Sequence, residues 1–176
     1  MNKFYSALQK NAFPIGIILI LTLSRIMPHP PNFTPVIAVA IMSAYFFRNI
    51  YLAFSIILIS MLMTDAFIGF HDNIIFVYLS LFLIISVFYK FSAKINLKNL
   101  FIFSFLGSII FFLVSNFGVW ALGSHATGNI PYEKNLIGLV ECYFLAIPFF
   151  GNTLISTILF AYSAYLANFY YYKKFS

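Results

Sequence analysis

Long apolar runs, separated by short polar or proline-rich stretches, make up most of the 176-residue chain. A helix needs about 20 mostly apolar residues to cross a bilayer. Six runs reach or approach that length, and they lie at about 12–27, 35–47, 51–70, 74–89, 100–116 and 149–172. The second run is short, so we expect neighbouring helices to shield it or its helix to continue past Arg48. The pattern predicts one all-α, polytopic integral membrane domain over residues 1–176, with six transmembrane helices.

A shorter apolar run at 136–147 precedes the last of these segments. It carries Glu141 in its middle and is too short to span a bilayer. We expect an additional short interfacial helix here, and Pro148 should break it from the final span because proline cannot donate the helical hydrogen bond. A seventh crossing would place Lys173 and Lys174 outside, against the preference of Lys and Arg for cytoplasmic loops, and we discount it.

The stretch RIMPHPPNFTPV at 25–36 separates the first two runs and contains four prolines. A proline lacks a backbone donor, fixes its own φ and pushes the preceding residue toward extended geometry. We therefore expect a stiff, extended loop that carries Arg25, His29 and Asn32. No small-x-small cleavage site follows the first apolar run, so we expect that run to be retained as a helix.

The distribution of charge supports the predicted crossings. Only 8% of the residues are charged, against about a quarter in a soluble domain. The net charge of +6 comes from scattered rather than clustered residues, so we expect no nucleic-acid partner. With six crossings and the N-terminus inside, the cytoplasmic segments hold eight cations and no acid: Lys3, Lys10, Arg48, Lys90, Lys94, Lys98, Lys173 and Lys174. The charge rule therefore predicts that both termini are cytoplasmic.

Asp65 is the most informative polar residue, because it lies inside the run at 51–70, roughly 7 Å below its outer end at ~1.5 Å rise per residue. A charge at such a position costs about 2.5–3.5 kcal/mol on insertion scales, which implies a partner or a polar cavity. Arg25 is the expected partner. Two interpretations stay open: the pair holds two helices together, or it lines a ligand cavity.

Other candidate ligand-binding residues fall at the same outer level, each with a simpler structural interpretation. His29 and Asn32 form one wall of a pocket or belong to a tight connector, and His71 faces that pocket or ends a helix. Asn116 and Trp120 share a helix face if the helix predicted at 100–116 continues past Asn116. Trp120 is then either an interfacial anchor or a stacking surface for a ligand. Glu141 lies on the interfacial segment and Asn152 near the start of the last span.

Motifs for chemistry are lacking. The sequence shows no known catalytic arrangement of a nucleophile, a base and an orienting group, and no phosphate-binding glycine loop. We therefore expect no catalytic residues and no enzyme activity. The histidine spacing resembles no metal-ligand motif, so we expect neither a metal nor another cofactor. The single cysteine, Cys142, is expected to fill space as a small apolar residue.

Four blocks carry a family resemblance: RIMPHPPNFTPV, MTDAFIGFH at 63–71, NFGVW at 116–120 and ECYFLAIPFFGNT at 141–153. In this order they resemble the signature blocks of a bacterial family of short, uncharacterised membrane proteins (DUF6580-like). That family is loosely similar to the substrate-binding S components of energy-coupling factor (ECF) transporters, six-helix proteins that capture vitamins or metal ions near the outer surface. The resemblance implies an ECF S-component-like fold. It implies pocket roles for Arg25, His29, Asn32, Asp65, Asn116, Trp120, Glu141 and Asn152.

The sequence departs from the family pattern in the last span, where Ser156 and Thr157 stand in place of a glycine and an acid.

We expect a bacterial inner-membrane protein that binds a vitamin-like or other micronutrient molecule at its outer face for uptake. Without an ATPase motif, energy from ATP would come from energising transporter subunits; the chain acts alone, with such a partner or as a homo-oligomer. The alternative is a membrane scaffold or interaction subunit whose polar residues serve helix packing. A lipid-modifying enzyme is a distant third possibility, because acidic metal-binding motifs are missing.

Overall fold

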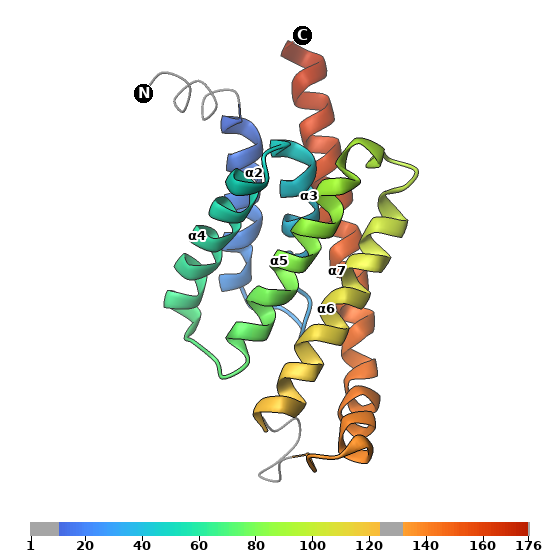
Figure 1. Cartoon of the computed structure of the whole chain (residues 1–176). Coiled ribbons are helices and arrows are strands. Elements are labelled where there is room, and N and C mark those ends of the chain that lie inside the picture. Colours follow the sequence, from blue (N-terminus) through green and yellow to red (C-terminus); the bar gives the residue numbers. More distant parts are fainter. Residues whose placement is uncertain (1–10, 124–131, 176) are drawn as a thin grey trace.

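The computed structural model describes residues 11–123 and 132–175, and every regular element within these ranges is a helix (Figure 1). The all-α prediction is therefore confirmed for the described chain. Within the described ranges the chain forms six α-helices: α2 (Ala12–Leu23), α3 (Val36–Phe47), α4 (Ile50–Ile68), α5 (Ile74–Lys90), α6 (Leu100–Leu122) and α7 (Leu136–Phe175). Two 3₁₀ turns, η1 (Ser24–Ile26) and η2 (Ser92–Lys94), follow α2 and α5.

The short helix α3 lies at the centre of the bundle. Ten of its twelve residues are buried, and it packs against all five of the other α-helices. Shielding by neighbours therefore explains how so short an apolar segment is accommodated. The helix does not continue past Arg48, which adopts a left-handed conformation (φ 46°) and ends it. Asn49 then accepts a hydrogen bond from the Leu52 amide (3.1 Å) and caps the start of α4.

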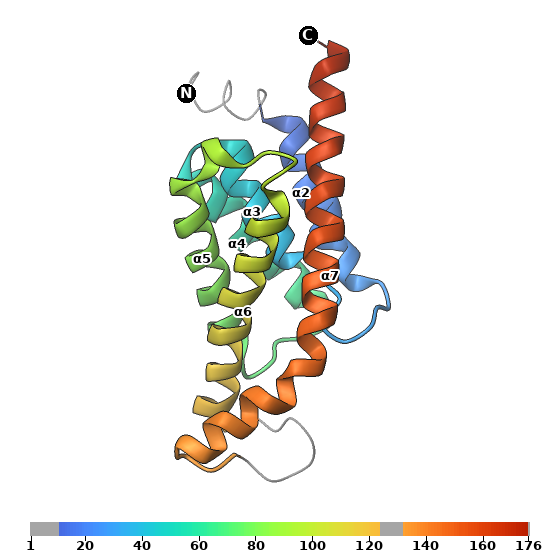
Figure 2. The same ribbon diagram turned by 90° about the vertical axis from the view of Figure 1, so that its right-hand side faces the viewer.

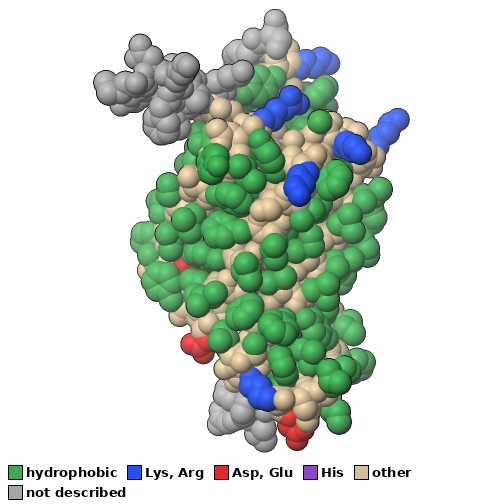
Figure 3. All heavy atoms as spheres, in the orientation of Figure 1, with side chains coloured by type: hydrophobic (Ala, Val, Ile, Leu, Met, Phe, Trp, Pro, Cys, Tyr) green, Lys and Arg blue, Asp and Glu red, His purple; other side chains and the backbone are tan. Residues whose placement is uncertain are grey.

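Three helices are long and apolar enough to cross a bilayer: Ile50–Ile68, Leu100–Leu122 and Leu136–Lys174. The remaining three are shorter apolar helices. Large apolar side chains cover the middle of the molecule's surface in the view of Figure 3, where a soluble protein would present mixed polar groups. These features are compatible with a membrane protein.

The last helix corrects one expectation. Residues 136–147 were predicted to form a separate interfacial helix, but they belong to the single 40-residue helix α7, with Pro148 inside it. Figure 2 shows that the first part of α7 runs obliquely and that the helix then turns toward its C-terminal part. A proline inside a helix removes one backbone hydrogen bond and bends the chain. The effect of Pro148 is thus a bend rather than a break.

The proline-rich segment is largely as predicted. Residues 27–35 contain no helix, and Met27 is extended (φ −75°, ψ 146°). Two features differ from a simple extended loop. Arg25 still lies in the helical turn η1, and the Phe33 amide donates to the Pro30 carbonyl (3.0 Å) in a turn that places Asn32 at φ 59°. An asparagine tolerates this left-handed conformation better than most residues.

Charges separate along the bundle axis. One end, the basic end, contains the α3–α4 and α5–α6 connections and the end of α7, with six described cations and no acidic side chain: Arg48, Lys90, Lys94, Lys98, Lys173 and Lys174. Figure 3 shows Lys and Arg side chains gathered there. The other end, the mixed-charge end, contains the proline loop, the α4–α5 connection and the start of α7. All four acidic residues of the chain, Asp65, Asp72, Glu133 and Glu141, belong to that half. Lys3, Lys10 and His125 lie outside the described residues.

The close approach of α6 and α5 depends on a glycine, which gives a testable prediction. A methyl group at Gly118 would collide with Asn73 Oδ1 and with the Cβ and Cγ atoms of Phe76, whereas one at Gly16 would meet no atom within 4 Å. Gly118→Ala should therefore destabilise the protein by about 1–3 kcal/mol through overpacking. Gly16→Ala, a matched helical control, should leave stability unchanged or raise it by up to ~1 kcal/mol. Thermal unfolding in detergent measures both; equal midpoints would show that the packing at Gly118 is looser than described.

Candidate functional site

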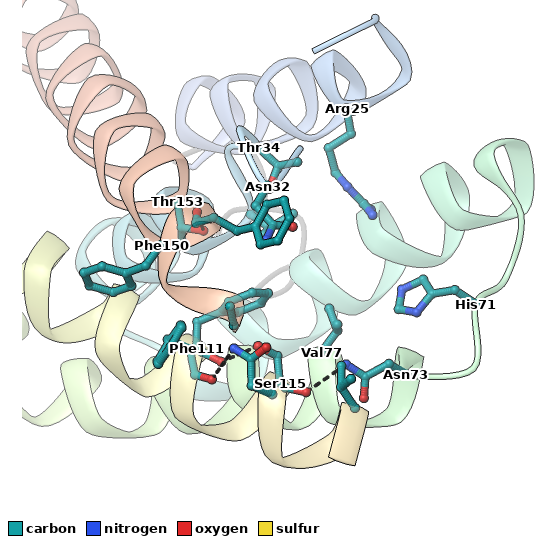
Figure 4. Close-up of a pocket in the computed structure, with 16 residues that line it drawn as sticks. Arg25, Asn32, Thr34, His71, Asn73, Val77, Phe111, Ser115, Phe150 and Thr153 are labelled. Carbon is teal, nitrogen blue, oxygen red and sulfur yellow. Dashed lines mark hydrogen bonds between the residues drawn. The ribbon is translucent and has the colours of Figure 1, made fainter. Parts of the chain in front are cut away.

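A cavity of about 270 Å³ opens at the mixed-charge end of the bundle (Figure 4). Its lining comes from η1, the proline loop, the start of α3, the α4–α5 connection, α5, α6 and α7. The polar lining residues are Arg25, Asn32, Thr34, His71, Asn73, Ser115, Asn116 and Thr153. The apolar lining residues are Val36, Val77, Phe111, Phe112, Val119, Ala146, Phe149 and Phe150. Segments distant in the sequence thus meet at one hollow.

Two local features of the sequence build its walls. On α6 the lining residues recur at helical spacing, at 111, 112, 115, 116 and 119, so they share one face of that helix. On α7 the lining residues lie on both sides of Pro148, from Ala146 to Thr153. Pro148 therefore lies between lining residues of the α7 wall, in a helix whose change of direction is visible in Figure 2.

The predicted Arg25–Asp65 ion pair is present, with 2.9 Å between Nη2 and Oδ1. Arg25 Nη1 also donates to Thr64 Oγ1 (2.6 Å), and Tyr78 donates to Asp65 Oδ2 (2.6 Å). The Asp65 side chain is 1% exposed and the Arg25 side chain 11%. The network joins η1, α4 and α5, so the interpretation that the pair holds helices together is confirmed.

The second interpretation of this pair, that it lines a cavity, applies to one partner. Arg25 lines the cavity, whereas Asp65 is not among its lining residues. A guanidinium carries five N–H donors, and only some of them are used by Asp65, Thr64 and Met61 Sδ (3.2 Å from Nη1). Arg25 therefore offers donors at the cavity wall while its charge is neutralised from behind.

Many of the other polar side chains in the lining already donate a hydrogen bond to a nearby backbone carbonyl. Asn73 Nδ2 donates to the Ser115 carbonyl (2.9 Å), and Asn116 Nδ2 to the Phe112 carbonyl (2.8 Å). The hydroxyls of Ser115 and Thr153 donate to carbonyls one turn earlier in their own helices (2.7 and 3.1 Å). On the α6 and α7 walls the side-chain oxygens of Ser115, Asn116 and Thr153 remain as acceptors, and the Asn116 amide keeps a second N–H donor. Such a cavity suits a small molecule that both donates and accepts hydrogen bonds.

The structure brings four of the nine predicted ligand-binding residues to the cavity: Arg25, Asn32, His71 and Asn116. Asp65 lies behind Arg25 and positions it. His29 is exposed, with its Nδ1 atom 3.0 Å from the Pro30 carbonyl, and Glu141 is exposed on α7. Neither of these two residues lines the cavity.

Trp120 and Asn152 make contacts that hold neighbouring segments. Trp120 lies on α6, which continues beyond Asn116 as considered above, and its indole Nε1 donates to the Glu133 carbonyl (2.9 Å). Lys134 Nζ donates to the Trp120 carbonyl and lies 5.5 Å from the centroid of its ring. Asn152 donates to the Pro31 carbonyl (3.0 Å), which fastens the proline loop to α7.

Sequence reasoning missed most of the α6 and α7 walls, including the four phenylalanines, together with Asn73 on the α4–α5 connection. Asn73 directly precedes α5. In an apolar helix a lipid-facing and a cavity-facing phenylalanine have the same periodicity, so no signal in the sequence separates them. The neighbouring Cys142 is buried, and its Sγ donates to the Asn116 carbonyl (3.4 Å).

Within residues 11–123 and 132–175 no group of three His, Cys, Asp or Glu side chains could hold a metal ion.

The family model described as a family of unknown function (DUF6580) matches residues 6–175. The chain therefore belongs to this family, as its four sequence blocks indicated. No curated protein and no solved structure matches the chain.

The buried pair gives a second prediction. Asp65→Asn leaves the Arg25 guanidinium without its counter-charge, and breaking a buried pair costs about 3–5 kcal/mol. We expect the lower end of that range, because Arg25 keeps contact with the cavity. The matched control Asp72→Asn removes an exposed charge and should change stability by less than about 0.5 kcal/mol. Unfolding midpoints in detergent measure both.

A double variant makes this second prediction more specific. Arg25→Met combined with Asp65→Asn removes both charges, so it should be more stable than Asp65→Asn alone. If the double variant is instead less stable than either single one, the pair is not the reason for the loss.

Proposed function

We propose that this protein crosses the bacterial inner membrane six times, with the basic end in the cytoplasm. The alternating connections place the start of α2 and the end of α7 at the same end of the bundle (Figure 1). Cytoplasmic loops favour Lys and Arg, and the basic end holds six described cations without an acidic side chain. The shielding of α3 supports a crossing role for a helix shorter than a bilayer normally requires.

The second part of the proposal is that the protein binds a small molecule at its outer face for uptake, as an S-component-like transporter. The observation that carries it is the cavity at the mixed-charge end. Its volume of about 270 Å³ lies just below the range of ~300–1,000 Å³ usual for ligand pockets, which suits a ligand of vitamin size or smaller. Phenylalanines on α6 and α7 offer an apolar surface, and a few polar groups fix orientation.

The charges of the cavity narrow the ligand class. The Arg25 charge is compensated by Asp65, and no acidic side chain is among the lining residues. Apart from His71, the lining residues of the cavity therefore carry little net charge. We infer a ligand that is uncharged or zwitterionic and carries an apolar or aromatic body, with both donor and acceptor groups on its polar edge.

The proline loop supports a binding role because it is rigid before the ligand arrives. Asn32 and Thr34 line the cavity from this loop, and the Asn152–Pro31 hydrogen bond fixes the loop to α7. A wall that is already ordered loses little conformational entropy on binding, which improves affinity. His29 and Glu141 are exposed and do not belong to the cavity lining.

The runner-up function is a membrane scaffold or interaction subunit. The observation in its favour is that Asp65, Trp120 and Asn152 make intramolecular contacts that hold segments together. Under the uptake proposal, energising subunits or a homo-oligomer would be partners. Under the scaffold proposal, the cavity stays empty of a specific ligand.

Orientation can be tested with single cysteines. Cys142 is the chain's one cysteine and is buried, so Cys142→Ser gives a background without reactive thiols. In this background, Asp72→Cys should react with a membrane-impermeant maleimide in intact spheroplasts. Lys98→Cys, at the basic end, should react only after the membrane is opened. Labelling of Lys98→Cys in sealed spheroplasts would reverse the proposed topology.

Ligand binding has its own prediction. Protein extracted in mild detergent should carry a co-purifying small molecule that mass spectrometry identifies, or should gain thermal stability from a member of a vitamin and micronutrient panel. Asn116→Ala removes one hydrogen-bond acceptor from the cavity and should weaken binding by about 1 kcal/mol, roughly fivefold in Kd. Asn96→Ala removes an amide at the basic end and should leave Kd unchanged. A broad panel without any stabilising compound would favour the scaffold function.

A further inference from the structure

A second polar hollow lies at the basic end, between the start of α2, the end of α3 and the last turns of α7. It consists of two adjoining cavities of about 170 and 340 Å³, which share Tyr45, Asn168 and Tyr172 in their linings. Arg48 lines the first and Lys173 the second. The cavity at the mixed-charge end shares no lining residue with this hollow.

The two cations of this hollow lack acidic neighbours. Arg48 and Lys173 are exposed, and neither forms an ion pair within the described parts of the chain. Every acidic side chain of the protein belongs to the other half. An uncompensated pair of cations beside a cavity at a membrane surface attracts a phosphate group, and each cation there contributes about 1 kcal/mol.

The hollow also contains an acceptor without a donor. Asn168 Oδ1 is buried and has no hydrogen-bond partner within the described residues. A buried carbonyl oxygen left unpaired is costly, so a ligand donor that reaches it would be favourable. The rings of Tyr45 and Tyr165 lie 5.6 Å apart beside it and provide an apolar wall. One hollow therefore combines cations, an amide acceptor and aromatic surface.

We propose that this hollow binds the headgroup of a phospholipid of the cytoplasmic leaflet. Its phosphate contacts Arg48 and Lys173, and a hydroxyl or ammonium group of the same headgroup donates to Asn168 Oδ1. Phosphatidylglycerol and phosphatidylethanolamine carry both groups, whereas phosphatidylcholine has the phosphate but no donor. The proposal rests on the membrane-crossing bundle with its basic end at the cytoplasmic surface. It does not depend on any ligand of the outer cavity.

The backbone at Arg48 provides a discriminating variant. Arg48 ends α3 with φ 46°, a left-handed conformation that glycine adopts without strain. Glycine is the residue most often found in this conformation at the C-terminal end of a helix. Arg48→Gly should therefore keep or raise the thermal midpoint in the absence of lipid while it removes one phosphate contact. A purely structural role for this residue would give the opposite result.

The test measures lipid binding to the full-length protein in detergent, by native mass spectrometry and by the rise of the unfolding midpoint with lipid concentration. Phosphatidylglycerol and phosphatidylethanolamine should bind more tightly than phosphatidylcholine, and inorganic phosphate alone should not raise the midpoint. Arg48→Gly and Lys173→Ala should each weaken phosphatidylglycerol binding about fivefold. Asn168→Ala should remove the advantage of phosphatidylglycerol over phosphatidylcholine.

Lys90→Ala is the matched control, because Lys90 also lies in the last turn of a helix at the basic end but lines neither cavity. It should leave binding unchanged. Equal losses for Lys90→Ala and Lys173→Ala would show diffuse surface attraction and overturn the site. Equal binding of all three lipids, or stabilisation by inorganic phosphate without lipid, would also overturn it. None of these three outcomes bears on the outer cavity, whose ligand is measured separately.

Discussion

The burial of α3 is the constraint on which the rest of the structure depends. A twelve-residue apolar helix is too short to face lipid along the full thickness of a bilayer, and here all five other α-helices pack against it. Small residues make this possible: Ala38, Ala40, Ser43 and Ala44 are fully buried and let neighbouring backbones come close. Because α3 begins only at Val36, the chain before it is left as a loop at the mixed-charge end, where the cavity lies.

Prolines in two segments, the loop before α3 and the helix α7, determine the backbone geometry at the mixed-charge end. In the loop they fix extended and turn geometry between η1 and α3, and in α7 Pro148 bends a helix that lines the same cavity. The hydrogen bond from Asn152 to the Pro31 carbonyl connects the two proline-containing segments. The cavity therefore lies between walls whose backbones are fixed by covalent restraint rather than by a ligand, which is the arrangement that a preorganised binding site requires.

The sequence was most informative where one physical rule dominates. Apolar length located the helices, charge placement distinguished the two ends, and the cost of a buried carboxylate predicted the Arg25–Asp65 pair. Prediction failed where two outcomes share one signal. A proline such as Pro148 can either break or bend a helix, and in this structure α7 continues through Pro148 while it packs against α6. Trp120 was a candidate for stacking on a ligand, but its indole nitrogen donates to the Glu133 carbonyl, a contact that only the fold determines.

The departure of the last span from the family pattern also has a structural account. Ser156 and Thr157 are fully buried, and both hydroxyls donate to the Thr153 carbonyl (3.0 and 2.7 Å), so their polarity is satisfied within α7. Such bonds to a carbonyl of the preceding turn tend to bend a helix, here roughly two turns beyond Pro148. An acidic side chain at position 156 or 157 would need a buried cation as its partner, and Arg25 is already paired with Asp65. With hydroxyls instead, this part of α7 adds no charge beside the cavity at the mixed-charge end, which Thr153 lines.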